Sequence, residues 1–304
     1  MHLSTLKTFC DLADTESFTK SARLNGITQS AVSQQMSGLE RHFKCLLVER
    51  SKKKFRLTRE GEIVYEYSRR ILLNCTELQF KLDDLRKAIS GSIRLATVYS
   101  IGLHELPLYI KAFLRARPTV NVHVEYLRFD DVIETVASNT SDLGLVAFPS
   151  RDPRLEIVPL RRDRMVLIAH PAQSLVIGPK ISVDDLQGKK FIGFAPDVPT
   201  RRATDKTLKS CGVNVTYVME FDNVETVKRA VEIDAGLAIV PEATVTQEVE
   251  KGTLVALEIE GADFSRPTAA IYQKGKLLSP AMKEFLQVLK SEPVAPTPVK
   301  KAKK

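Results

Sequence analysis

The chain has 304 residues, 43% of them hydrophobic, which is enough for two or more domains, each with its own core. It contains no apolar run of about eighteen residues and no N-terminal secretion signal, so we expect a cytoplasmic protein without a membrane partner. Its four cysteines and five histidines follow no metal-ligand spacing. We therefore expect no metal site, no cofactor and no disulfide framework.

The net charge of +8 lies at the two ends of the chain. Residues 1–90 hold sixteen Lys or Arg against eleven Asp or Glu, whereas residues 91–290 hold equal numbers of each sign. A basic N-terminal region predicts binding to a polyanion, although charge that merely aids solubility is the alternative. The tail, residues 291–304, is rich in Pro, Ala and Lys and is predicted to be disordered. Its lysines could add weak DNA affinity, or could simply be solvated.

Two amphipathic helices are predicted before residue 26. The first is indicated by apolar residues at helical spacing: Leu6, Phe9, Cys10 and Ala13. Ser17 can cap a second helix that carries Phe18 and Ala22, and Asn25-Gly26 suits the left-handed turn that ends a helix.

The next segment, residues 27–43, is predicted to be a third helix with two distinct faces. Thr28 can cap its start, so the helix begins near Gln29. An apolar stripe predicts the buried side: Val32, Met36, Leu39 and Phe43. Short hydroxyl or amide side chains that can bond base edges or phosphates share another face: Ser30, Ser33, Gln34 and Ser37. An ordinary surface helix is the alternative, but helix, Gly-containing turn and helix together indicate a helix-turn-helix whose second helix enters the major groove.

A basic hairpin is predicted directly after this helix. Its cations bracket Phe55 and Leu57 and comprise Arg50, Lys52, Lys53, Lys54, Arg56 and Arg59. Beside a helix-turn-helix, such a wing is expected to contact DNA phosphates or enter the minor groove.

A long helix is predicted from Thr58 to about Ile89. Its apolar residues recur at steps of three and four, close to a heptad seam: Val64, Tyr67, Ile71, Cys75, Leu78, Leu82, Leu85 and Ile89. A thin stripe of this kind predicts pairing with a second copy, and packing against the chain's own body is the alternative. A homodimer would place two recognition helices on a roughly palindromic site in double-stranded DNA.

From Ser92 onward, predicted strands alternate with predicted helices, which indicates parallel sheets flanked by helices. The strands are residues 93–98, 120–127, 142–148, 164–170, 191–194, 215–220, 236–240 and 268–272. The clearest helices are residues 103–115, 130–137 and 280–290.

Two strand-to-helix junctions are candidate ligand sites, because ligands bind beyond the carboxyl ends of parallel strands beside helix N-termini. Ser100 and Ile101 follow the first strand, and Thr200 and Arg201 follow the strand at residues 191–194. Together they could hold one small anion. Plain capping by the hydroxyls and solvation of the arginine is the alternative.

Residues 1 to about 90 resemble the winged helix-turn-helix and linker helix of a LysR-type transcriptional regulator. The matching residues share one register: Leu6, Phe9, Ser17-Phe18, Ala22, Ala31-Val32-Ser33, Leu39-Glu40, Glu49-Arg50, Leu57-Thr58 and Gly61. The family often has Pro, Gly and Phe where this chain has Ser30, Lys44 and Val48, so the base preference does not carry over.

The resemblance implies a fold and a set of contacts. The fold is an α/β chain with a mainly helical N-terminal winged helix-turn-helix and a two-lobed effector domain similar to periplasmic binding proteins. The implied segments are a DNA-binding domain (1–60), a dimerisation helix (58–90), lobe one (91–162 with 267–290), lobe two (163–266) and the tail (291–304). Implied DNA contacts include Gln29, Ser30, Ser33, Gln34 and Lys53, and Phe148 and Asn223 join the effector residues.

The resemblance further implies a homotetramer and a mechanism. A small-molecule effector between the lobes would change the arrangement of four winged domains on a promoter, and RNA polymerase is a further candidate partner. The effector domain has only Cys211, so an internal disulfide switch is excluded there, whereas single-thiol oxidation or an intersubunit bond is not.

Other protein classes fit less well. An enzyme is disfavoured because the chain has no nucleophile elbow, phosphate loop or dinucleotide fingerprint, so no catalytic residue is predicted. A transport receptor would need an export signal and would have no use for residues 1–90. A small-molecule binding protein with an architectural DNA-binding domain remains the alternative, and its binding would show little sequence preference.

Overall fold

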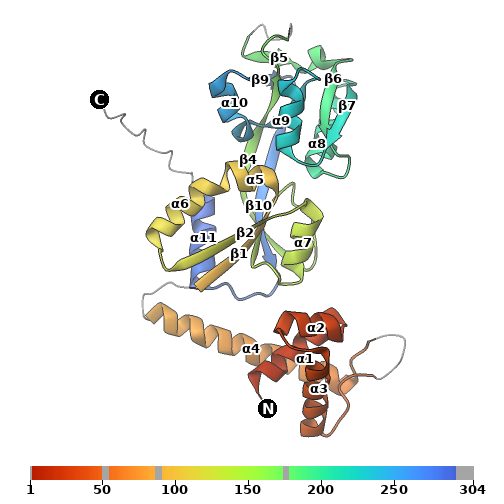
Figure 1. Cartoon of the computed structure of the whole chain (residues 1–304), viewed down its shortest axis with the longest axis vertical. Coiled ribbons are helices and arrows are strands. Elements are labelled where there is room, and N and C mark those ends of the chain that lie inside the picture. Colours follow the sequence, from red (N-terminus) through yellow and green to blue (C-terminus); the bar gives the residue numbers. More distant parts are fainter. Residues whose placement is uncertain (1, 50–54, 86–90, 174–177, 292–304) are drawn as a thin grey trace. The chain divides into compact units, whose positions relative to one another are not determined.

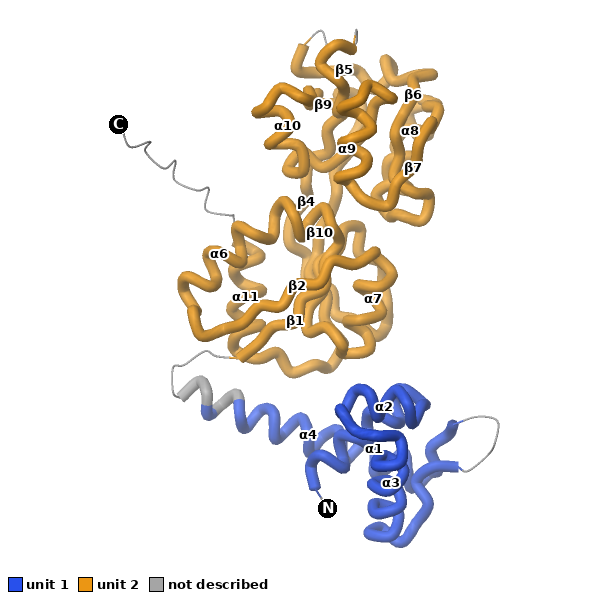
Figure 2. Tube along the Cα trace, in the orientation of Figure 1, with its two compact units in different colours: residues 1–88 blue, residues 89–304 orange. Residues whose placement is uncertain are grey.

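The computed structural model of the chain describes residues 2–49, 55–85, 91–173 and 178–291. The chain divides into two compact units, residues 1–88 and 89–304 (Figure 2). Within the described ranges, no helix is long and apolar enough to cross a membrane.

The described part of unit 1 is built from four helices and a short strand bridge. The helices are α1 (Leu3–Thr15), α2 (Phe18–Asn25), α3 (Gln29–Phe43) and α4 (Arg59–Leu85) (Figure 1). Val48 and Leu57 pair as an antiparallel bridge between α3 and α4. The core gathers one stripe from each of the first three helices and the segment after them: Leu6, Phe9, Leu12, Ala22, Val32, Met36, Leu39, Leu47 and Val48.

Local signals set the helix ends in unit 1. The Ser17 hydroxyl accepts from the Lys20 amide, and Gly26 ends α2 with a φ of 64°. Thr28 caps α3 by accepting from the Ala31 amide. One core prediction was wrong: Phe43 is 39% exposed and packs edge-on against His42. It lies at the last position of α3, one turn beyond Leu39, which is the last buried residue of the stripe.

Leu47 and Thr58, which precede α4, pack tightly around Gly61. The Leu47 amide donates to Glu40 Oε1, and the Gly61 amide donates to the Thr58 hydroxyl. A β-carbon added at Gly61 would lie 2.1 Å from the Leu47 carbonyl oxygen, a backbone atom. Only glycine fits this position without moving the main chain.

Unit 2 contains two lobes, and the first is a sheet with helices on both faces (Figure 1). Its strands are β1 (Gly91–Thr97), β2 (Val120–Tyr126), β3 (Leu143–Ala147) and parts of two long strands, β4 (Leu155–Ala169) and β10 (Ser265–Gln273). Its helices are α5 (Tyr99–His104), α6 (Leu106–Ala116), α7 (Phe129–Ala137) and α11 (Pro280–Lys290). β1 runs parallel to β2 and β3, whereas β10 is antiparallel to β3.

The second lobe has the same alternation of strands and helices. Its strands are β5 (Lys180–Ser182), β6 (Lys190–Phe194), β7 (Thr216–Phe221), β8 (Ala238–Pro241) and β9 (Val255–Glu260). Its helices are η1 (Val183–Leu186), α8 (Pro199–Ser210), α9 (Val224–Glu232), η2 (Glu242–Thr244) and α10 (Thr246–Lys251). Two apolar clusters, one around Phe191 and Leu208 and one around Ile192 and Val227, form its core.

The two long strands connect the lobes. β4 pairs with β10 up to the Arg164–Ser265 pair and then, from Met165, pairs with β8 and β9. Asp163 and Arg266 are direct partners in this ladder, close to the point of transfer. The chain therefore passes between the lobes on two neighbouring antiparallel strands.

Two elements that were predicted in unit 2 have different bounds in the structure, and the strands β5 and β9 were not predicted. The single helix predicted at residues 103–115 is two helices, α5 and α6, which meet at Glu105. The strand predicted at residues 164–170 is the last part of β4, which begins at Leu155. Before Met165 its apolar residues are interrupted by Glu156, by Pro159 and by four charged residues at 161–164, so it lacks the fully buried apolar run of the second half.

A partly buried carboxylate, Asp142, anchors the start of β3 in lobe one. It accepts from the Arg94 amide and guanidinium and from Lys276 Nζ, at 2.7 to 3.1 Å. Burial alone would raise the pKa of Asp142, but these hydrogen bonds outweigh it and lower the pKa to about 2. Burial also lowers the pKa of Lys276, so the desolvation of this lysine offsets part of the stability that the Asp142 hydrogen bonds contribute.

Gly61→Ala is expected to destabilise unit 1 by about 2 kcal/mol, because the new methyl group meets backbone that cannot move cheaply. Gly38→Ala, in the middle of α3 with nothing within 4 Å of its β-carbon position, is the matched control. It should instead stabilise by roughly 0.5–1 kcal/mol, the ordinary helix preference for alanine. Urea unfolding followed by circular dichroism measures both, and equal effects of the two substitutions would contradict the packing argument.

Asp142→Asn is expected to lower the free energy of unfolding by at most about 2 kcal/mol at pH 7, the equivalent of the drop in pKa from 3.8 to about 2. Because the folded-state pKa is depressed, this stability is present above pH 4 and is lost as the pH falls toward 2. The difference between wild type and variant should therefore shrink over that range. Unfolding curves at a series of pH values test this, and a constant difference would rule it out.

Candidate functional site

The exposed face of α3 is the first candidate site. Thr28, Gln29, Ser30, Ser33 and Gln34 are all exposed, while Val32, Met36 and Leu39 are buried on the opposite face. The Thr28 hydroxyl caps the helix and lies 2.9 Å from the Ser30 hydroxyl. The exposed groups are neutral donors and acceptors, the type that reads base edges.

The predicted wing cations Arg50, Lys52, Lys53 and Lys54 lie outside the described residues.

On α4, most residues of the predicted dimerisation seam are exposed: Tyr67, Ile71, Leu78 and Leu82. Val64 instead packs partly against the core of unit 1, so the exposed stripe starts at Tyr67. The side chain of Leu85 is outside the described set.

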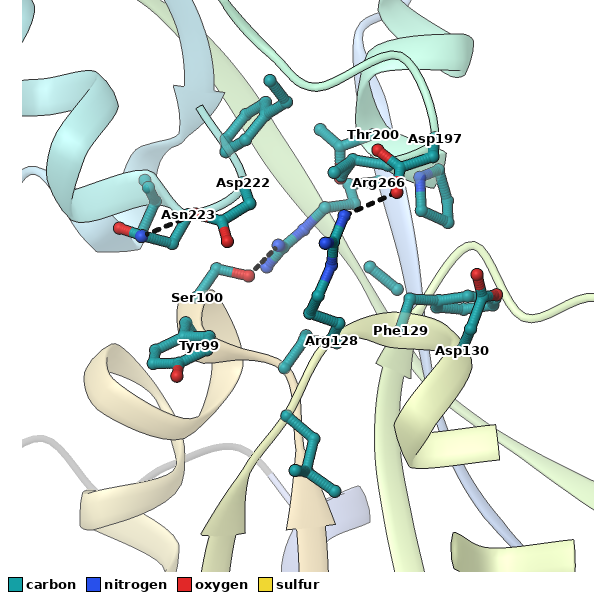
Figure 3. A pocket seen from close by; sticks show the side chains of 17 residues that line it. Tyr99, Ser100, Arg128, Phe129, Asp130, Asp197, Thr200, Asp222, Asn223 and Arg266 are labelled. Atoms are coloured by element: carbon teal, nitrogen blue, oxygen red, sulfur yellow. Dashed lines mark hydrogen bonds and ion pairs between the residues drawn. The ribbon is translucent and has the colours of Figure 1, made fainter. Parts of the chain in front are cut away.

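The second candidate site is a pocket between the two lobes of unit 2 (Figure 3). It encloses about 750 Å³, including space open to solvent. Lobe one supplies the loops after β1 and β2 and the last residue of β3, and lobe two supplies the loops after β6 and β7. The pocket therefore lies where parallel strands end, as expected for a ligand site in an α/β fold.

Four helix N-termini meet at this pocket. The residue before each helix lines it, namely Val98 before α5, Arg128 before α7, Val198 before α8 and Asn223 before α9. Asn223 caps α9 by accepting from the Thr226 amide, whereas the other three capping positions supply no side-chain hydrogen bond. First-turn amides and helix dipoles favour a negative charge at this place.

Charged side chains also line the pocket. Arg128 of lobe one donates to Asp197 of lobe two at 2.6 Å, which joins the walls (Figure 3). Both side chains are more than half exposed. Asp130 and Asp222 add two further carboxylates. An entering anion would compete with Asp197 for the Arg128 guanidinium.

Arg266 contributes the other guanidinium of the wall, although its side chain is only 1% exposed. It donates to the Ser100 hydroxyl at 2.8 Å and to the carboxylates of Glu105 and Asp163 (Figure 3 shows the Ser100 contact). Burial raises the pKa of Glu105, as does the nearby Asp163 charge, and the arginines Arg266 and Arg161 only partly oppose this.

Three of the effector residues predicted from sequence line the pocket. Ser100 and Thr200 occupy the first turns of α5 and α8, and Asn223 precedes α9. The structure brings these three together from segments that are far apart in sequence. Whether they contact an effector stays a prediction.

The other three predicted effector residues do not line the pocket. Ile101 is 3% exposed in the core of lobe one, and Phe148 packs against the same core. The guanidinium of Arg201 lies 3.4 Å from the Tyr217 ring centroid and pairs with Asp205 and Glu220. Arg201 follows Thr200 by one residue, about 100° around α8, so its side chain leaves on another face.

Sequence reasoning missed Arg128, Asp197, Asp222 and Arg266. Arg128 did carry a usable signal, because it stands between the strand predicted at 120–127 and the helix predicted at 130–137. Arg266 carried none, since its role depends on which strands are neighbours. In the part of the chain that the structure describes, no cluster of His, Cys, Asp or Glu could hold a metal ion.

Comparison with known families matches both units. Residues 3–62 match the bacterial regulatory helix-turn-helix protein model of the lysR family, and residues 86–293 match the LysR substrate binding domain. A RuBisCO operon transcriptional regulator from Allochromatium vinosum is 29% identical over 294 residues, covering 96% of this chain and 97% of the relative.

Solved structures share the fold. Full-length CbnR complexed with its target DNA is 24% identical, with a TM-score of 0.60, covering 95% of this chain and 99% of that one. The CcmR regulatory domain of Synechocystis PCC6803, in complex with 2-PG, is 23% identical with a TM-score of 0.60, covering 66% of this chain and 96% of that one. Since the two family models together span nearly all of the described residues, the chain belongs to the LysR family of transcriptional regulators.

Proposed function

We propose that this LysR-type regulator binds a small anionic effector in the pocket between its lobes, and that occupancy changes how its α3 helices hold promoter DNA. The observation that carries the anionic class is the meeting of four helix N-termini at one cavity. Each such terminus favours a nearby negative charge by about 0.3–1 kcal/mol. No catalytic step is part of the proposal.

The polar groups of the wall support this assignment. Ser100 and Thr200, on opposite lobes, can each donate a hydrogen bond from the hydroxyl. Arg128 supplies a positive charge whose ion pair with Asp197 is exposed to solvent. The carboxylates of Asp130, Asp197 and Asp222 oppose an anion, so the effector should place its charge by the helix ends and Arg128. Its uncharged donors would then suit the carboxylates. The complex of the CcmR regulatory domain with 2-PG supports a small molecule in this type of domain.

For DNA, we propose that Gln29, Ser30, Ser33 and Gln34 contact base edges, with the wing lysines on the backbone. The CbnR complex with target DNA supports this use of the N-terminal unit. The exposed stripe of α4, Tyr67 to Leu82, would pair with a second copy and so bring two α3 helices to one roughly palindromic site. A tetramer that acts on promoter access or on RNA polymerase, in the bacterial cytoplasm, completes the proposal.

Pocket occupancy can be measured with a single fluorophore, because the chain contains no tryptophan. In the full-length Tyr99→Trp protein, inorganic phosphate should change the fluorescence with saturation, since position 99 lines the pocket. Arg128→Gln in this background should weaken phosphate binding about tenfold. Asp197→Asn should strengthen it about two- to fivefold, because it removes a competitor for Arg128 whose exposed ion pair is worth about 0.2–1 kcal/mol.

Arg154→Gln is the matched control for this experiment. Arg154 belongs to the same lobe and is also paired with carboxylates, but it does not line the pocket. Its loss should leave phosphate binding unchanged. Equal weakening of phosphate binding by Arg128→Gln and Arg154→Gln would reject the anion assignment. So would the absence of a saturable fluorescence change when phosphate or sulfate is added to the Tyr99→Trp protein without further substitution.

The DNA assignment is tested with sites selected from random duplexes by the full-length protein. Ser33→Ala and Gln34→Ala should each lose about 1–3 kcal/mol of preference for the selected site, with little change on random DNA. Gln247→Ala, an exposed helical glutamine in unit 2, is the control and should alter neither. Losses that are the same on selected and random DNA would show that α3 does not read bases.

A further inference from the structure

One buried arginine joins the pocket wall to the strands that pass between the lobes. Arg266 Nη1 donates to the Ser100 hydroxyl at 2.8 Å, and Nη2 donates to Glu105 Oε1 at 3.0 Å and Asp163 Oδ2 at 2.6 Å. Nε donates to the same Asp163 oxygen at 3.0 Å. The acceptors lie in α5, at the junction of α5 and α6, and in β4, so the guanidinium is held in one orientation.

The surroundings of Arg266 cancel its charge. Glu105 and Asp163 both pair with it, and Arg161 pairs with both of these carboxylates. The cluster thus contains two cations and two anions. A neutral cluster attracts an anion only weakly, and the Arg266 side chain is almost fully buried. Arg266 is therefore expected to affect the binding of an effector mainly through the pocket group to which it is hydrogen-bonded.

That group is the hydroxyl of Ser100. A serine hydroxyl has one donor hydrogen and two acceptor lone pairs. Because Arg266 donates to the oxygen, the hydroxyl hydrogen is directed away from the guanidinium, and Ser100 is partly exposed on the pocket wall. Figure 3 shows the Ser100 hydroxyl joined to the Arg266 guanidinium among the side chains that line the pocket.

We propose that Arg266 is a positioning residue of the effector site: it fixes the Ser100 hydroxyl as a donor and so selects an effector oxygen that accepts, such as a carboxylate or phosphate oxygen. The inference rests on the proposed anion-binding function. An effector group that must donate, such as an ammonium, would meet only the second lone pair of an oxygen that already accepts from a cation, which makes that oxygen a weaker acceptor. Hydrogen bonds in such a chain polarise one another, so the cation strengthens the Ser100 donor.

A double-mutant cycle separates this role from a general electrostatic one. The protein is full-length Tyr99→Trp and the probe is inorganic phosphate. Ser100→Ala is expected to weaken phosphate binding about tenfold, as is Arg266→Gln, because each removes the positioned donor. The Ser100→Ala/Arg266→Gln double variant should also lose about tenfold, whereas independent effects would multiply to about a hundredfold.

Two further variants guard against a trivial result. Ser100→Thr keeps a hydroxyl and should lose much less affinity than Ser100→Ala. Arg266→Gln leaves two buried carboxylates with one arginine and could unfold the protein, so Glu105→Gln/Arg266→Gln, which removes one charge of each sign, replaces it in the cycle if circular dichroism shows loss of structure.

The outcomes distinguish the two levels of the proposal. Saturable phosphate binding with a non-multiplying cycle and retention by Ser100→Thr supports the positioning role. Saturable binding with a loss of about a hundredfold in the double variant, or no loss in Ser100→Ala, overturns the role of Arg266 and leaves the anion site intact. Absence of phosphate binding in the reporter protein before any further substitution overturns both.

Discussion

The ion-paired guanidinium of Arg266 lies where β4 and β10 carry the chain from one lobe to the other. It pairs with Asp163, its partner in the strand ladder, and with Glu105 at the junction of α5 and α6. Charges buried to this degree are tolerated only with their partners, since removal of one partner from such a pair costs about 3–5 kcal/mol. The strands and the α5 junction are therefore held in register by electrostatics as well as by backbone hydrogen bonds. Arg266 and Ser100 also line the pocket, so this ion-paired cluster fixes the positions of that part of the pocket wall.

Helix α5 is tied at both ends to Arg266, and its last residue also contacts the second lobe. At its start, Ser100 accepts from Arg266, and just beyond its end Glu105 accepts from the same arginine. Its last residue, His104, lies 2.7 Å from Glu225 of α9, and Glu225 also pairs with the buried Lys228 of the second lobe. A six-residue helix with these contacts cannot shift without altering either the crossover or the contact between lobes. An effector that binds at its N-terminus would therefore act on an element that contacts both the crossover strands and the second lobe, and such a contact is required for linkage to a distant site.

The parts of this molecule that could be predicted from sequence are those set by local physics. Thr28 and Ser17 cap helices because their hydroxyls reach the next turn, and the alternation in residues 92–290 gives the α/β class. Ser100 and Thr200 were found because strand-to-helix junctions are local. Arg201 was misplaced because a helix changes the direction of a side chain by about 100° per residue, and only the packing of α8 on Tyr217 decides which direction is buried. Arg266 was missed because it acts through Ser100 and Asp163, more than a hundred residues away in sequence. Pairing of distant strands leaves no local pattern.

For the proposed anion, the distribution of its contacts over both lobes would matter more than their number. A ligand can shift an equilibrium between lobe arrangements only by the difference in its affinity for the two. An anion held by α5 and α7 of lobe one alone would bind every arrangement equally and carry no signal. Contacts to α8 and α9 of lobe two, by contrast, exist only when the lobes are close enough. Two helix N-termini at about 0.3–1 kcal/mol each and one hydroxyl bond to a charged group at about 1.5–3 kcal/mol would then depend on closure. The resulting difference of roughly 2–5 kcal/mol corresponds to a thirtyfold to several-thousandfold shift, which is ample to change occupancy of a promoter.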